Sequence, residues 1–137
     1  MRLITAGRRG WLLAALAMVA CDGGEPPTPM APSPPPAAGP PPLTATVVIG
    51  SNNKFAPLEV TIAVGGRVTF VNQNNRSHDI TSDPLHLHTD CPPIMAVGFI
   101  QPGQTKETGV LDVARVCGFH DHMQENNPDL HGRIIVQ

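Results

Sequence analysis

Four residues in the C-terminal half of the chain have the types and the spacing of transition-metal ligands. Cys117, His120 and Met123 follow one another as C-x2-H-x2-M, so a tight loop at a strand end would aim a thiolate, an imidazole and a thioether at one point. His78 lies just past a predicted strand and supplies a second imidazole. Two imidazoles and a thiolate with a weak axial Met suit one copper ion that cycles between Cu(I) and Cu(II). The set predicts one-electron transfer without a bound substrate, and therefore no enzyme activity.

The elements that must position these residues are predicted to be short strands. Residues 44–49 are β-branched and apolar, and residues 58–64 alternate apolar and polar side chains at period two. Gly65-Gly66 supplies a turn, after which residues 67–71 return as the second strand of a hairpin. Three later segments are also apolar enough for strands: 94–100, 110–116 and 132–137. Short strands at regular spacing in a chain of this size predict an all-β sandwich or barrel.

The first 20 residues have the composition of a secretory signal peptide. Arg2, Arg8 and Arg9 give a basic start, and an apolar run over residues 11–20 precedes Cys21. Met18-Val19-Ala20-Cys21 resembles the lipobox of bacterial lipoproteins, in which the cysteine is acylated and becomes the new N-terminus. Either the Sec or the twin-arginine route is compatible with the segment. We expect export to the cell envelope and a lipid anchor on Cys21, with ordinary cleavage as the alternative.

Residues 21–43 form a predicted linker between the anchor and the folded domain. Of the 16 prolines in the chain, 10 fall between Asp22 and Pro42. Such a segment favours extended polyproline II and acts as a semi-rigid spacer. The sequence therefore predicts one domain, residues 44–137, held away from a membrane surface.

The charge balance argues against a nucleic-acid partner. The chain has 9 Lys+Arg against 11 Asp+Glu, so it lacks the basic stripe that would neutralise phosphates. The 6 histidines, by contrast, all fall between His78 and His131. The C-terminal half must therefore be where imidazole is used.

The three cysteines leave a second interpretation open. If Cys21 carries lipid, Cys91 and Cys117 remain as an even pair in an oxidising compartment, where they can form a disulfide. A bridged Cys117 cannot ligate copper, and the metal site would then be built from histidines alone. This alternative predicts a copper chaperone, storage or sensor module.

Two H-x-H pairs supply candidates for such a site. His86 and His88 form one pair, and His120 and His122 form the other. Residues two apart in an extended segment face the same side. His88 and His122 are therefore alternative ligands, beside His78 and His120, for a copper or zinc ion.

Several separated segments resemble the cupredoxins, the blue copper family that includes plastocyanin and amicyanin. Residues 55–62 and 64–72 look like the family's early strands and their turn, and His78 falls where the family has its first histidine ligand. The C-x2-H-x2-M spacing is similar to the short ligand loop of amicyanins, and residues 132–136 are similar to the final strand. The resemblance covers residues 45–137.

The resemblance implies a Greek-key β-sandwich and a copper site made by His78, Cys117, His120 and Met123. It also implies an electron carrier rather than an enzyme. We expect a monomer, tethered to a membrane through its lipid, that meets a redox partner protein or a copper donor or acceptor.

Overall fold

The structure is a computed structural model that describes residues 39–137. The predicted signal peptide, the acylation site Cys21 and most of the linker lie outside the described residues. Between residues 39 and 137, no helix is long and apolar enough to cross a membrane.

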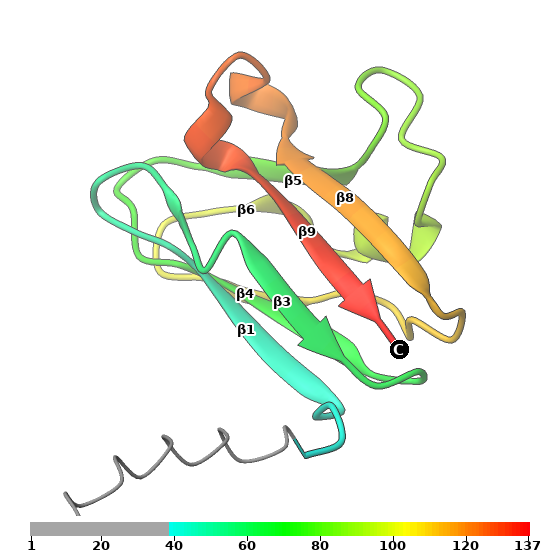
Figure 1. Ribbon diagram of the computed structural model, residues 1–137. Helices are drawn as coiled ribbons and strands as arrows, with labels where there is room; N and C mark the ends of the chain where they lie inside the picture. The colour runs from blue at the N-terminus through cyan, green and yellow to red at the C-terminus, as the bar shows by residue number, and fades with distance from the viewer. Residues whose placement is uncertain (1–38) are drawn as a thin grey trace, which may run out of the picture. The chain divides into compact units, whose positions relative to one another are not determined.

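Strands and short 3-10 helices make up the described part of the chain, which is a β-sandwich of two sheets (Figure 1). The strands are β1 (Thr44–Ile49), β2 (Phe55–Ala56), β3 (Glu59–Ile62), β4 (Arg67–Asn72), β5 (His78–Ser82), β6 (Gly98–Ile100), β7 (Thr105–Glu107), β8 (Arg115–Asp121) and β9 (His131–Val136). The 3-10 helices are η1 (Pro92–Ala96), η2 (His122–Gln124) and η3 (Pro128–Leu130). The all-β prediction is confirmed.

The two sheets differ in size and in their role at the site. The smaller sheet has the order β2-β1-β4-β7, and the larger has the order β3-β9-β8-β5-β6. In the larger sheet β8 lies antiparallel to both β5 and β9, which flank it (Figure 1). These three central strands carry or adjoin most of the histidines.

Alternating side chains of both sheets fill the core, as the period-two pattern predicts. Three aromatic rings meet there, those of Phe55, Phe70 and Phe119, with centroids 5.1 to 6.3 Å apart. Val60 and Ile62 of β3 are likewise buried. With no Tyr and few aromatic residues, the rest of the core is mainly Val, Ile and Leu.

The predicted hairpin of residues 58–64 and 67–71 is wrong, because its two strands lie in different sheets. β3 pairs with β9, whereas β4 pairs with β1 and β7. The backbone amides of the connecting turn are bonded to three other segments: Ala63 to Pro42, Val64 to Gln137 and Gly65 to Leu111. The turn therefore carries the chain from one sheet to the other.

Two further boundaries differ from the prediction. The segment 94–100 is only half strand, because Pro92 and Pro93 lack amide donors and begin the 3-10 helix η1. The strand expected over residues 110–116 starts at Arg115 and continues to Asp121. This second shift changes the site, since it turns the expected ligand loop into strand.

Candidate metal centre

Cys91 and Cys117 form a disulfide, with their Cα atoms 5.7 Å apart. Both cysteines belong to the buried core between the sheets. The expected role of Cys117 as a copper ligand is therefore corrected, since its sulfur is already bonded. The disulfide that the cysteine count left open is the arrangement that the structure contains.

The strand conformation of β8 also separates the other members of the C-x2-H-x2-M motif. Side chains three apart in a strand point to opposite faces of the sheet. Cys117 and Phe119 face the core, whereas His120 faces away from it, in register with Thr81 and His131 on the neighbouring strands. The motif therefore does not assemble one ligand set.

His78 and Met123 lie apart from the remaining histidines. His78 is fully buried, and its Nδ1 lies 2.9 Å from the Oδ2 of Asp121. Its Nε2 is the one buried side-chain nitrogen or oxygen in the described part of the chain without a hydrogen-bond partner. Met123 follows in η2 and is 57% exposed. Neither residue joins the cluster described next.

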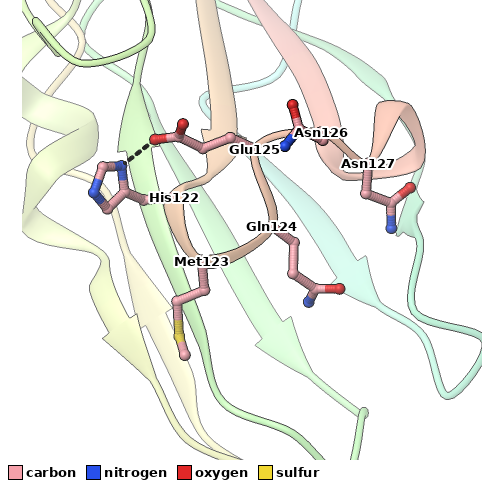
Figure 2. A pocket seen from close by; sticks show the side chains of 6 residues that line it. All are labelled: His122, Met123, Gln124, Glu125, Asn126 and Asn127. Carbon is pink, nitrogen blue, oxygen red and sulfur yellow. Dashed lines mark ion pairs between the residues drawn. The ribbon is translucent and has the colours of Figure 1, made fainter.

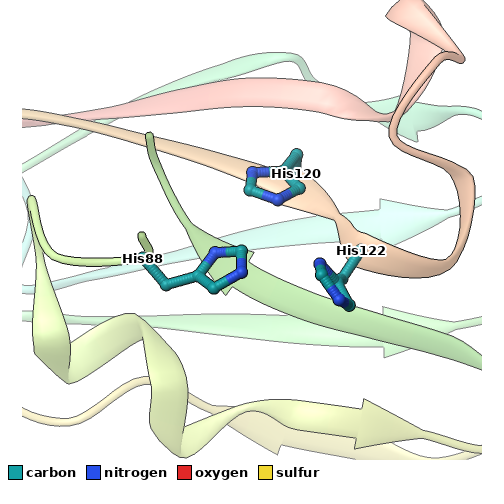
Figure 3. Close-up of side chains that lie close together, drawn as sticks. All are labelled: His88, His120 and His122. Atoms are coloured by element: carbon teal, nitrogen blue, oxygen red, sulfur yellow. The ribbon is translucent and has the colours of Figure 1, made fainter. Parts of the chain in front are cut away.

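Three histidines come together on the outer face of the larger sheet: His88, His120 and His122 (Figure 3). One ring nitrogen of each lies within 4.8 Å of the corresponding nitrogens of the others. The ring centroids are 4.9 Å apart for His88 and His122 and 5.3 Å apart for His88 and His120. The structure thus brings together His88 and His122, which were predicted as alternative ligands, and His120, which belongs to the first predicted ligand set.

Each of these histidines is delivered by a different local structure. His120 ends the outward-facing row of β8 and is fully buried beneath the loop that follows β5. His122 opens η2, whose N-cap is the side chain of Asp121. His88 lies in the loop between β5 and η1 with φ of 55°, a left-handed conformation that costs a non-glycine residue about 1–3 kcal/mol. The surrounding structure holds His88 in this conformation beside the other two rings.

The Nδ1 atoms of all three rings are engaged by oxygen acceptors. His88 donates from Nδ1 to the carbonyl oxygen of Ser82 at 2.9 Å. His120 donates to Asp83 Oδ1 at 2.7 Å, and Nδ1 of His122 lies 2.7 Å from Oε1 of Glu125. Because an acceptor on Nδ1 fixes the tautomer, the lone pairs of neutral His88 and His120 lie on Nε2. Histidines that bind metals are oriented in this way by carboxylates and carbonyls.

The spacing of the rings is compatible with a metal ion after a small movement. In a tetrahedral site with bonds of about 2.0–2.1 Å, ligand nitrogens lie about 3.3 Å apart. In the structure these nitrogens lie within 4.8 Å of one another, so each ring would have to move inward by about 1 Å or less to bind a metal. His88 lies on a loop and the side chain of His122 is 44% exposed, so these two rings can make the adjustment.

The charges around the cluster favour a cation. Asp83 and Glu125 place two carboxylates directly behind two of the three rings. Nδ1 of His86 lies 3.8 Å from the same carboxylate oxygen of Glu125. The Nδ1 atoms of His120 and His122 thus face negative charge.

The segment after β8 forms a shallow pocket beside the cluster. It has a volume of about 430 Å³ and is lined by residues 122–127. Figure 2 shows the ion pair between His122 and Glu125, and Met123 pointing in a different direction from the imidazole of His122. The same short segment that lines this pocket therefore carries both His122 and its carboxylate partner, Glu125.

The sequence contained a usable signal for this cluster. The alternation in His120-Asp121-His122 predicts two imidazoles on one side of an extended segment, and the structure places both in the cluster. The role of Asp83 behind His120 was not predicted, because the two residues are 37 positions apart in the sequence.

Comparisons with known proteins give the fold independently. No family model matches the sequence, and no curated protein matches it. Among solved structures, the oxidised plastocyanin of Dryopteris crassirhizoma is 18% identical with a TM-score of 0.54, and the match covers 68% of this chain and 100% of that one. A purple cupredoxin from Nitrosopumilus maritimus is 18% identical, with a TM-score of 0.50 and 68% and 99% coverage.

An amicyanin variant in its Cu(I) form matches at 18% identity with a TM-score of 0.51, over 69% of this chain and 82% of that chain. At such identities the agreement concerns the path of the backbone. It agrees with the two-sheet topology described above, and with the family resemblance of residues 45–137. The described part of the chain therefore has the cupredoxin fold.

Proposed function

We propose that this chain binds one copper ion through His88, His120 and His122 and serves as a copper chaperone, store or sensor in the cell envelope. The observation that carries the proposal is that three imidazoles converge while each engages an oxygen acceptor through Nδ1. With Nδ1 engaged, each ring would bind a metal through Nε2, where His120 now accepts a hydrogen bond from Thr81. Copper would supply a Lewis-acidic, redox-active centre there.

The donor set favours copper over other divalent metals. Imidazole nitrogens suit both copper and zinc, and for a given site Cu²⁺ binds more tightly than Zn²⁺ in the Irving–Williams order. One of the similar solved structures is an amicyanin in its Cu(I) form. Zinc is the competing occupant, and a competition titration separates the two metals.

The disulfide argues against the electron-transfer function that the thiolate set predicted. A bonded Cys117 offers no thiolate, and the thiolate is what distinguishes blue-copper electron-transfer sites. A three-imidazole site suits binding and release of copper. We therefore favour the histidine-ligated function that the cysteine count had left open.

Location in the cell envelope is supported by two independent features. The N-terminal 20 residues have signal-peptide composition and precede Cys21, which resembles an acylation site. Disulfides persist in oxidising compartments outside the cytosol. In that setting the chain would be membrane-anchored and would exchange copper with a donor or acceptor protein.

The decisive experiment is a Cu(II) titration of the full chain, followed by metal analysis and visible and EPR spectra. We expect one copper per chain, nitrogen hyperfine structure and no intense visible charge-transfer band. The double variant His88→Ala/His122→Ala should lose this copper, and any metal it retains measures binding elsewhere in the chain, including at Cys21.

His86→Ala is the matched control, because this histidine lies in the same loop and its side chain is 76% exposed. It should keep one copper per chain. An intense blue band in the wild type, lost in Cys117→Ser, would overturn the proposal in favour of thiolate ligation. Retention of all bound copper by the double variant would also overturn it.

A further inference from the structure

The hydroxyl group of Thr81 lies at the edge of the histidine cluster. Thr81 is on β5, directly opposite His120 in the register of β5 and β8, and is 4% exposed. Its Oγ1 lies 3.0 Å from the Nε2 of His120. Because the Nδ1–H of this ring already donates to Asp83, the hydroxyl donates to the Nε2 lone pair. Thr81 therefore contacts the nitrogen that a metal would use.

The cluster supplies three protein donors, one fewer than a tetrahedral ion takes. Among residues 39–137, no fourth His, Cys, Asp or Glu joins the group that offers ligand atoms within 4.8 Å of one another. Both nearby carboxylates are engaged by the Nδ1 atoms of His120 and His122. Sites with three protein ligands keep the fourth position for an exchangeable ligand, whereas structural sites are closed by a fourth residue.

Metal binding would change the hydrogen bonding of Thr81. A metal about 2.0–2.1 Å from Nε2 of His120 would take the place of this hydrogen bond, so the buried hydroxyl must turn aside and lose its acceptor. A buried donor without an acceptor is unfavourable. A ligand in the fourth coordination position would offer a new acceptor at this place.

The surroundings limit what that ligand can be. His120 is fully buried and Thr81 nearly so, while the side chain of His122 is 44% exposed. Access is therefore from the side of His122, where the cluster is exposed. A Cu(II) ion would carry its charge at the open coordination position, with the carboxylates of Asp83 and Glu125 one ring farther away, so an anion is favoured there.

We propose that the fourth position of this three-histidine centre binds a small monodentate anion, and that Thr81 is a positioning residue that donates a hydrogen bond to it. This inference rests on the proposed copper site. It assigns that site an exchangeable small-anion ligand in addition to its copper.

The test uses sodium azide as the probe on the full chain loaded with one Cu(II). Azide should produce a new charge-transfer absorption and shift the EPR parameters while the nitrogen hyperfine structure persists. Thr81→Val removes the hydroxyl and nearly keeps the shape. It should still bind one copper but bind azide about tenfold more weakly, which corresponds to about 1.4 kcal/mol. Thr81→Ser should retain wild-type azide affinity, and Thr61→Val on β3 is the matched control.

Each outcome decides a separate point. If the wild type binds no copper at the histidines, the proposed function fails and this inference fails with it. If copper binds but azide leaves both spectra unchanged, the open position is refuted while the copper site stands. If azide binds Thr81→Val as tightly as the wild type, the role of Thr81 is refuted.

Discussion

The Nδ1 of His78 and the Oδ2 of Asp121 lie 2.9 Å apart in the core, and both side chains are fully buried. The other carboxylate oxygen of Asp121 accepts from the backbone N–H groups of Asp79, at 2.9 Å, and Met123, at 3.1 Å. The Gln124 amide donates to Oδ2 at 3.2 Å. Asp121 thus anchors, from inside the sandwich, the strand end that presents His120 and His122 outside.

Replacement of the Asp121 carboxylate should destabilise the fold. In Asp121→Asn, the amide group cannot accept from all four donors, and His78 loses its charged partner. Breaking a buried pair costs about 3–5 kcal/mol, and because the substitution is nearly isosteric we expect about 3 kcal/mol less free energy of unfolding in urea. Asp129→Asn, which removes a surface pair with Lys54, should cost less than about 1 kcal/mol. An equal decrease in the free energy of unfolding in Asp121→Asn and Asp129→Asn would contradict the anchoring role of Asp121.

The carboxylate of Glu125 should set copper affinity without being a ligand. Its Oε1 lies 2.7 Å from Nδ1 of His122, and loss of such outer partners lowers metal affinity about 10–100-fold. Competition titration of Glu125→Gln should show a decrease in this range with one copper still bound. Asp112→Asn, on the exposed surface, is the control and should bind copper like the wild type. Unchanged copper affinity in Glu125→Gln would show that this carboxylate has no role in copper binding.

The disulfide should contribute to stability but not to metal binding. The bond closes a loop with a sequence separation of 26, for which chain entropy predicts about 3.5 kcal/mol. We expect Cys91→Ala/Cys117→Ala to unfold at lower urea concentration, with a free energy of unfolding reduced by about 2–4 kcal/mol. Its copper stoichiometry should stay at the wild-type value below the unfolding transition. Loss of the copper signal from the folded double variant would show that sulfur takes part in the site.

Gly118 should be required for the position of Asp83. A Cβ at residue 118 would lie 2.1 Å from Oδ2 of Asp83, so Gly118→Ala must displace the carboxylate that orients His120. Because the Asp83 side chain is 34% exposed, it can move away, and we expect a small loss of stability but about a tenfold loss of copper affinity. Gly39→Ala, where nothing lies within 4 Å, is the control. Wild-type affinity in Gly118→Ala would show that Asp83 is dispensable.

The fold class was predictable because period-two alternation is a local property of the sequence. Residues 44–49 and 67–71 were predicted as strands and lie in β1 and β4, and the predicted strand 132–137 overlaps β9. Their partners could not be predicted in the same way. The backbone groups of the turn after β3 are bonded to segments distant in sequence, so only the assembled sandwich decides that β3 and β4 separate.

The sequence by itself determined that histidines and cysteines in the C-terminal half would form a site or a disulfide, because residue type and count fix which chemistry is possible. Which of them meet was decided by tertiary structure alone. β8 continues through Asp121, so its side chains alternate between faces: Cys117 meets Cys91 in the core, and His120 joins His88 and His122 outside. The reason is the pleat of the strand, which separates residues that a loop would have brought together.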